Sequence, residues 1–238
     1  MSSVETSLDD GVAWIWLNRP ERLNAVAPAL VDDLLRALDQ VSAAKAVVLA
    51  GRGRAFCAGH DLKEPAPHGD SRARLERLQD VTRRLRGLPQ PVIAAVHGYA
   101  IGAGAEFALG CDLVLAAEDA VFAFPETGLG LSVTGGASRL LPLLVGPLKA
   151  KELVLLGERV GAAAALELGL VNAVLPDVHT AAADWARRIA DRPAGAMALA
   201  KRALDNGIDI AAALELEISH ALITEHTPEG AGTLRGVQ

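Results

Sequence analysis

AVVLAGRGRAFCAGHDLK at residues 46–63 and VIAAVHGYAIGAGAE at residues 92–106 decide how this chain folds. Each stretch runs from an apolar, strand-like segment, residues 46–50 or 92–96, into a glycine-bearing turn. The second turn opens into a short helix predicted to begin at about Ala103. A glycine turn before a helix presents unbonded backbone N–H groups at the positive end of the helix dipole. Two such turns can converge on one oxygen atom.

Strand and helix patterns alternate along most of the chain. The remaining strand-like runs are residues 12–17, 112–116 and 170–175. Apolar residues at helical spacing from Pro28 predict an amphipathic helix, and the charged segment 70–86 predicts a helix exposed to solvent. From about Asp177 the pattern is all helical. This alternation favours an α/β fold.

Composition limits the class of protein. The chain has 238 residues, enough for one sizeable core in a single domain. Apolar residues make up 51% and charged residues 22%, which indicates a folded globular chain rather than a disordered one. The net charge of −6 argues against a protein that binds a nucleic-acid backbone. No window reaches the roughly 18 apolar residues of a membrane span, and residues 1–10 lack a basic or long apolar stretch, so we expect a cytoplasmic protein.

Metal and disulfide chemistry have little support in the sequence. Cys57 and Cys111 are far apart and lack a CxxC partner, so we expect two buried thiols. The six histidines are scattered without metal-ligand spacing. Ser132 lies in a segment that lacks the last glycine of a nucleophile elbow. We therefore expect no metal and no redox cofactor.

Two glutamates stand alone in apolar, glycine-bearing surroundings. Glu106 falls in the first turn of the predicted short helix, between Ala105 and Phe107. Glu126 lies in FAFPETGLG at residues 122–130. Apolar neighbours desolvate a carboxyl group and raise its pKa toward the range useful for proton transfer. The same pattern is equally compatible with a helix-dipole role for Glu106 and an ordinary exposed loop for Glu126.

Several motifs follow one another in a characteristic order. They are LNRP at 17–20, NA at 24–25, GRGRAFCAGHDLKE at 51–64, GYAIGAGAE at 98–106, CD at 111–112 and FPE at 124–126. In order and spacing they resemble the crotonase, or enoyl-CoA hydratase/isomerase, family over about residues 5–225.

The resemblance implies a fold, a substrate and an assembly. The implied fold is α/β, a crotonase-like spiral of ββα units over residues 1–190 with a helical C-terminal oligomerisation region, residues 191–238, in the same single domain. The implied substrate is an acyl-CoA thioester, with coenzyme A part of the substrate and no separate cofactor. The implied assembly is a homotrimer or homohexamer, without a nucleic-acid or membrane partner.

The resemblance also assigns roles to residues. It implies that the backbone N–H groups of His60 and Ala103 form an oxyanion hole for the thioester carbonyl. It implies that Glu106 and Glu126 hold and activate a water molecule, which makes reversible hydration of a 2-enoyl-CoA the preferred reaction. The positions that match the nucleotide end of coenzyme A are Ala58, Leu62 and Lys63, with Arg22 a partner for a phosphate.

The sequence departs from the family pattern in three places. The glycine-rich loop at residues 130–136, GLSVTGG, is one residue short and lacks a proline. His60 replaces a small residue, and residues 230–238 end before an aromatic and basic tail. The alternatives are therefore a Δ3,Δ2-enoyl-CoA isomerase in which Glu126 acts alone, and a hydrolase, decarboxylase or dehalogenase that shares the oxyanion hole. A noncatalytic or RNA-binding relative is the non-enzyme alternative.

Overall fold

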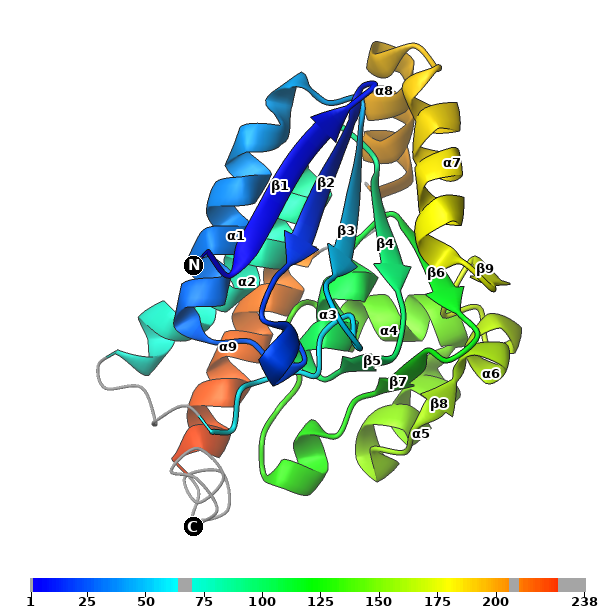
Figure 1. Cartoon of the computed structure of the whole chain (residues 1–238). Helices are drawn as coiled ribbons and strands as arrows, with labels where there is room; N and C mark the ends of the chain where they lie inside the picture. The colour runs from blue at the N-terminus through cyan, green and yellow to red at the C-terminus, as the bar shows by residue number, and fades with distance from the viewer. Residues whose placement is uncertain (1, 64–69, 206–209, 227–238) are drawn as a thin grey trace.

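The structure is a computed structural model that describes residues 2–63, 70–205 and 210–226 (Figure 1). Its strands are β1 (Val4–Asp9), β2 (Val12–Leu17), β3 (Ala46–Gly51), β4 (Val92–Val96), β5 (Tyr99–Ile101), β6 (Leu113–Ala117), β7 (Val121–Ala123), β8 (Val160–Gly161) and β9 (Ala173–Leu175). Its α-helices are α1 (Pro28–Gln40), α2 (Ser71–Gly87), α3 (Ala103–Gly110), α4 (Ala137–Val145), α5 (Pro147–Leu156), α6 (Ala162–Glu167), α7 (Val178–Ala190), α8 (Ala194–Asp205) and α9 (Ile210–Glu225). Short 3-10 turns are η1 (Pro20–Arg22), η2 (Val41–Ala43) and η3 (Glu126–Leu129).

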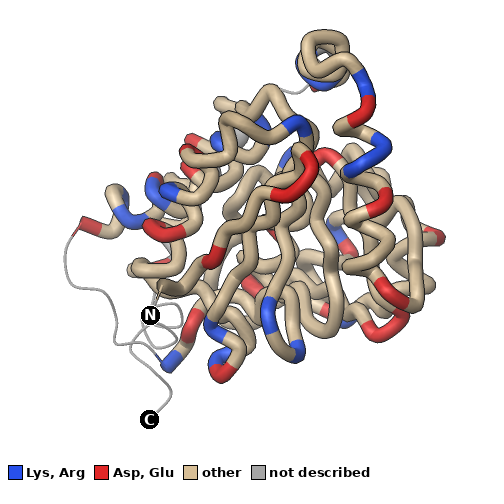
Figure 2. The backbone as a smooth tube through the Cα atoms, turned by 45° about the horizontal axis from the view of Figure 1, so that its top comes forward, with Lys and Arg blue, Asp and Glu red and all other residues tan. Residues whose placement is uncertain are grey.

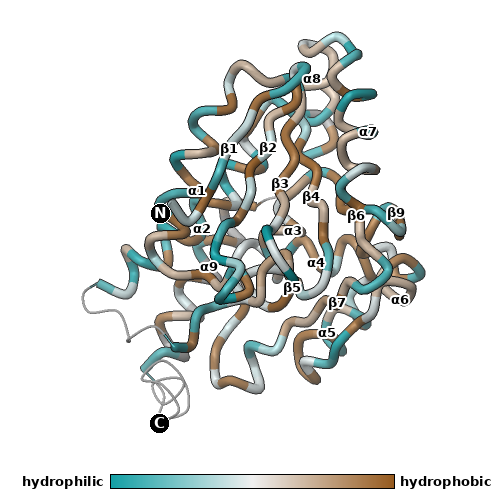
Figure 3. Tube along the Cα trace, in the orientation of Figure 1, coloured by the Kyte–Doolittle hydropathy of each residue, from teal (hydrophilic) through white to brown (hydrophobic). Residues whose placement is uncertain are grey.

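A mostly parallel sheet in the order β1-β2-β3-β4-β6-β9 forms the centre of the molecule. Only β1 runs antiparallel to its neighbour among the strands of this sheet in the described residues. Every residue of β3 and β4 is buried, and Figure 3 shows these strands as a hydrophobic band. Continuous apolar strands are typical of parallel sheets that are covered on both faces.

Helices cover the two faces of this sheet. Val47 and Leu49 of β3 pack into the cluster that contains α1, whereas Val48, which points to the other face, packs into the cluster that contains α7. The strands predicted at residues 46–50 and 92–96 and the helices predicted from Pro28 and Ala103 are confirmed. Strands β5, β7 and β8, which the sequence did not reveal, form a separate small sheet in the order β5-β7-β8.

The prediction of a solvent-exposed helix at residues 70–86 is wrong for one face of α2. Asp70 caps this helix by accepting a hydrogen bond from the N–H of Arg72. The buried residues of α2 are Leu75, Leu78, Gln79, Val81, Thr82 and Leu85. Helix α2 packs against α1, α3 and α9, whereas Arg72, Arg77, Arg83 and Arg84 of the same helix are exposed. This buried face of α2 reaches the candidate site described below.

Charged residues of both signs alternate over the outer helices and loops (Figure 2). Ion pairs such as Arg77 with Asp32 (2.9 Å) and Arg84 with Asp39 (2.6 Å) join α2 to α1. Within the part of the chain that the structure describes, no helix has the length and apolar character to cross a membrane. Cys57 and Cys111 are free and buried, which confirms the expected thiols. Glu64 and residues 230–238 lie outside the described residues. The boundary at residue 190 between the spiral core and the C-terminal helical region stays a prediction.

Asn24 ties the loop after β2 to the loop after β3. Its side chain is fully buried, at 0% exposure. Its Oδ1 accepts from the N–H of Arg19 (2.8 Å), and its Nδ2 donates to the carbonyls of Arg52 (2.9 Å) and Ala55 (2.7 Å). The loop after β3 is the one that leads to the first glycine turn.

We expect Asn24→Ala to lower the free energy of unfolding by about 2–4 kcal/mol, because it leaves these buried backbone groups without partners. Urea denaturation at one fixed protein concentration would measure the loss. Asn18→Ala is the matched control, since the side chain of Asn18 makes an exposed hydrogen bond to Glu5. Equal stability losses in the two variants would contradict this role for Asn24.

Candidate active site

A short parallel ladder brings the two glycine turns together. The N–H of Cys57 donates to the carbonyl of Tyr99 (2.8 Å), and the N–H of Ile101 donates to the carbonyl of Cys57 (3.0 Å). Gly59 and Gly102 each lie two residues beyond the Cys57–Ala100 bridge, so parallel chains place them side by side. A Cβ atom on Gly59 would stand 3.9 Å from the Cα of Gly102.

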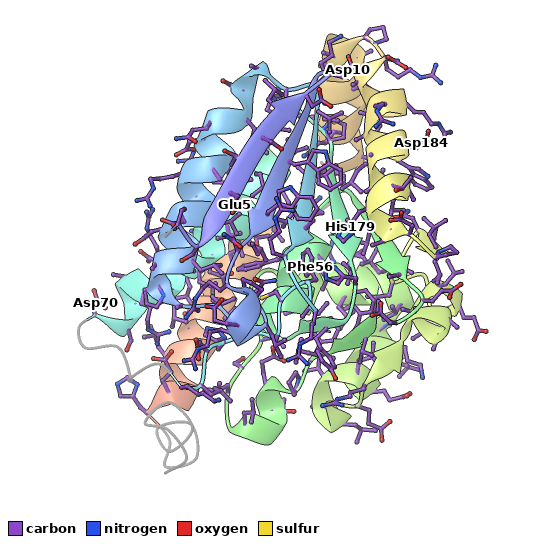
Figure 4. The ribbon with its side chains drawn as sticks, in the orientation of Figure 1. Glu5, Asp10, Phe56, Asp70, His179 and Asp184 are labelled. Atoms are coloured by element: carbon purple, nitrogen blue, oxygen red, sulfur yellow. The ribbon has the colours of Figure 1, made fainter. Side chains whose placement is uncertain are left out.

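His97 fastens the loop after β3 to the turn after β4. Its carbonyl accepts from the N–H of Phe56 (2.8 Å), and its Nε2 lies 2.9 Å from the carbonyl oxygen of Gly53. The carbonyl can only accept, so Nε2 carries the proton. Figure 4 labels Phe56 near the lower ends of the central strands, where these two segments meet. The ladder to the glycine turns begins directly after this contact.

The backbone N–H of His60 faces away from Val26. Val26 donates to the carbonyl of Gly59 (2.7 Å) and accepts from the N–H of Asp61 (3.0 Å), so its bonds flank His60. In an extended chain the N–H of the flanked residue points to the opposite side. That side is where Cys57 pairs with the chain leading to Gly102.

The second turn ends at the start of α3. Gly102 has a positive φ of 52° and precedes Ala103, the first residue of the helix. The N–H of Gly102 donates to the carbonyl of Ala123 in β7 (2.9 Å). The N–H of Ala103 has no acceptor within its own helix, because the acceptor would lie before the helix begins. It therefore adds a donor at the positive end of α3.

Glu126 stands beside this second turn. It follows β7 in η3 and is 8% exposed. Its Oε1 lies only 2.9 Å from where a Cβ on Gly102 would stand, and its buried Oε2 has no hydrogen-bond partner in the described structure. Burial raises the pKa of this carboxyl from 4.5 to about 7. The exposed-loop alternative for Glu126 is excluded by this burial.

Glu106 lies in α3 in a different environment. It is 1% exposed, and its Oε1 and Oε2 accept from the N–H and the hydroxyl of Thr134, each at 2.6 Å. A Cβ on Gly135 would stand 2.6 Å from the Cβ of Glu106, so the loop after Thr134 lies directly against this glutamate. The site therefore contains one carboxyl group bonded to Thr134 and one carboxyl group with an unbonded buried oxygen.

A family model described as enoyl-CoA hydratase/isomerase matches residues 7–233 of this chain. The chain belongs to the enoyl-CoA hydratase/isomerase family. The 1,2-epoxyphenylacetyl-CoA isomerase of Escherichia coli (strain K12) is 38% identical to it over 219 residues, which cover 87% of this chain and 83% of the relative.

Solved structures of the family share the fold. An enoyl-CoA hydratase from Mycobacterium avium subsp. paratuberculosis K-10 has a TM-score of 0.91 at 31% identity, with 98% of each chain covered. An enoyl-CoA hydratase/isomerase from Xanthobacter autotrophicus Py2 has a TM-score of 0.90 at 36% identity, with 98% of this chain and 91% of that chain covered. The family resemblance and the α/β fold that it implied are confirmed.

The residues predicted to bind coenzyme A lie in or next to the first glycine turn. The guanidinium of Arg22 pairs with Asp61 at 3.2 Å, so its charge is already partly neutralised. Leu62 is 46% exposed, Lys63 is exposed, and the N–H of Ala58 donates to the carbonyl of Leu23 (3.0 Å). Their role in this enoyl-CoA hydratase/isomerase family member stays a prediction.

The side chain of His60 is separate from its backbone role. Burial, with a smaller contribution from Arg74, lowers the pKa of its imidazole to about 4, so the ring is neutral at pH 7.

Among the described residues no group of three His, Cys, Asp or Glu side chains is arranged to hold a metal ion. Sequence reasoning missed Thr134 and Gln79 as site residues, and only the unusual loop at residues 130–136 gave any signal.

Gly104 sets how closely the two turns approach. A Cβ there would stand 2.1 Å from the carbonyl oxygen of Cys57, so Gly104→Ala must displace one turn by roughly 1 Å. We expect enoyl-CoA turnover to fall by about 10²-fold, the penalty that such a misplacement can cause. Gly161→Ala is the control, because nothing lies within 4 Å of its Cβ position. Near-normal turnover by Gly104→Ala would show that the spacing of the turns is unimportant.

Proposed function

We propose that this protein hydrates a 2-enoyl-CoA reversibly to a 3-hydroxyacyl-CoA. The observation that carries the proposal is the pair of buried glutamates in unlike environments beside two adjoining glycine turns. Hydration adds a hydroxyl to the β-carbon and a proton to the α-carbon, so it requires an acceptor and a donor of protons at neighbouring positions. Two carboxyl groups in different environments meet that requirement.

The backbone N–H groups of His60 and Ala103 form the proposed oxyanion hole. Negative charge collects on the thioester oxygen as water attacks the β-carbon. Preorganised amide donors stabilise that charge by about 3 kcal/mol each in comparable sites. The support for this role is the position of the two groups in adjoining turns, one opposite Val26 and one at the start of α3. The neutral imidazole of His60 has no step in this mechanism.

Glu106 and Glu126 take opposite roles in the proposed reaction. Glu106, held by Thr134, accepts a proton from the attacking water. Glu126 has a pKa of about 7 and is therefore partly protonated at neutral pH. It lies beside Gly102, close to the proposed carbonyl position, and donates its proton to the adjacent α-carbon. The products are the hydroxylated thioester, a protonated Glu106 and an ionised Glu126, and proton exchange with solvent restores the starting forms.

A Δ3,Δ2-enoyl-CoA isomerase is the second candidate. Both oxygens of Glu106 already accept hydrogen bonds from Thr134, whereas Glu126 combines an unbonded oxygen with a pKa near neutrality. Such a group can remove a proton from one carbon and return it to another. Neither reaction oxidises or reduces the substrate. In both, the nucleotide of coenzyme A is assigned to Arg22, Ala58, Leu62 and Lys63.

Glutamine substitutions distinguish the two reactions. For hydration, Glu106→Gln and Glu126→Gln should each reduce kcat by at least roughly 10²-fold, because an amide neither accepts nor donates the required proton. For isomerisation, only Glu126→Gln should be severe, and the wild type should convert a 3-enoyl-CoA faster than it hydrates crotonyl-CoA. Both variants are assayed on both substrates. Near-normal hydration by Glu106→Gln would exclude the proposed mechanism.

The pH profile of kcat/KM gives a check on the same assignment. Hydration uses protonated Glu126, so its rate should fall as pH rises through about 7. Isomerisation uses ionised Glu126, so its rate should instead fall as pH decreases through about 7. Glu126→Gln should remove either titration from the residual activity.

We also propose a homotrimer or homohexamer. Large leucines on α5 and α8 are exposed, among them Leu148 (82%), Leu155 (67%), Leu199 (67%) and Leu204 (82%). Large exposed apolar side chains on these two helices are typical of surfaces that other subunits cover.

Light scattering should give three or six times the mass of one chain. Leu204→Glu should shift the protein to smaller species, because it places a charge in the proposed interface. Leu8→Glu on β1, where the leucine is 57% exposed, should not. A monomer at micromolar concentration for the wild type would contradict this assembly.

A further inference from the structure

Thr134 binds the carboxylate of Glu106 with two donors. The N–H of Thr134 lies 2.6 Å from Oε1, and its hydroxyl lies 2.6 Å from Oε2. Thr134 is itself buried, at 4% exposure. A bidentate contact of this kind fixes both the position and the rotation of the carboxylate plane. The buried Oε2 of Glu126, by contrast, has no hydrogen-bond partner in the described structure.

The loop that carries Thr134 is itself fixed from α2. The N–H of Gly135 donates to Oε1 of Gln79 (2.7 Å), and the hydroxyl of Thr82 donates to the carbonyl of Gly135 (3.1 Å). The Nε2 of Gln79 donates in turn to the carbonyl of Leu214 in α9 (3.2 Å). The buried side chains of Gln79 and Thr82 therefore hold Gly135, the residue that follows Thr134. The loop cannot shift without breaking these bonds.

We infer that Thr134 is a positioning residue whose hydroxyl fixes Glu106 as the acceptor for the attacking water, and that it thereby determines the capacity of the site for hydration. This inference rests on the proposed function. Hydration requires a water molecule held at a fixed position, so it depends on the orientation of Glu106. Isomerisation moves a proton within the substrate through Glu126, so it does not depend on the orientation of Glu106. Loss of the hydroxyl should therefore affect the two reactions differently.

Thr134→Val removes the hydroxyl and keeps the size and the backbone N–H. We expect kcat for crotonyl-CoA hydration to fall roughly 10- to 100-fold, the range for loss of one hydrogen bond to a charged group. KM should change little, and isomerisation of a 3-enoyl-CoA should stay within about twofold of the wild type. Thr134→Ser restores the hydroxyl and should recover most of the hydration rate.

Thr180→Val is a matched control. Thr180 holds Asp177 at the start of α7 in the same manner, with its N–H at 3.1 Å and its hydroxyl at 2.6 Å from the two carboxylate oxygens. That pair is exposed and far along the chain from Glu106. Thr180→Val should leave both reactions unchanged, although it weakens the helix cap. The melting temperature of each variant reports on folding separately from kcat.

The outcomes separate this inference from the proposed function. A wild type that does not hydrate crotonyl-CoA would contradict the proposed function. The positioning of Glu106 by the Thr134 hydroxyl is then tested by the ¹³C resonance of the Glu106 δ-carboxyl, which Thr134→Val should shift in a Glu126→Gln background and Thr134→Ser should not. An unshifted resonance would overturn it. With an active wild type, unchanged hydration in Thr134→Val, or an equal loss in both reactions, would overturn it as well.

Discussion

The backbone ladder between Cys57 and the Tyr99–Ile101 strand is the interaction on which the candidate site depends. The two glycine turns belong to different loops, and this ladder joins them. The parallel pairing places the turns at equal distances beyond the ladder, and Gly104 permits the close approach. His97 holds the same two segments together one step earlier. The separation of the two turns is thus set by backbone contacts.

The large sheet places this ladder at one edge. β3 and β4 are neighbours and parallel, so their carboxyl ends lead into adjacent loops at the same side of the sheet. Helices on both faces bury the strands and leave these loops as the natural position for a ligand. The small sheet then connects the second turn to Glu126, because the N–H of Gly102 bonds to β7 shortly before that glutamate.

Burying two carboxyl groups in one apolar region is unfavourable unless each is stabilised or neutralised. The structure deals with them differently. Glu106 receives two hydrogen bonds from Thr134, which compensate for lost hydration. Glu126 receives none at its buried Oε2, so desolvation favours its protonated form and brings its pKa to about 7. Residues of the same side-chain type therefore stand in two different environments.

The sequence by itself determined the family, the central strands and the candidate acids. Motif order, apolar runs at β3 and β4, and isolated Glu106 and Glu126 are local signals, readable because each depends on neighbouring residues. Only the tertiary structure decided how the acids differ. The contact of Thr134 with Glu106 spans 28 residues, and that of Gln79 with Gly135 spans 56. The many arginines of α2 led to the prediction of an exposed helix, so the sequence did not reveal the buried face that supplies Gln79. Burial and hydrogen bonding between distant segments set the chemistry of a carboxyl group, and no local pattern encodes them.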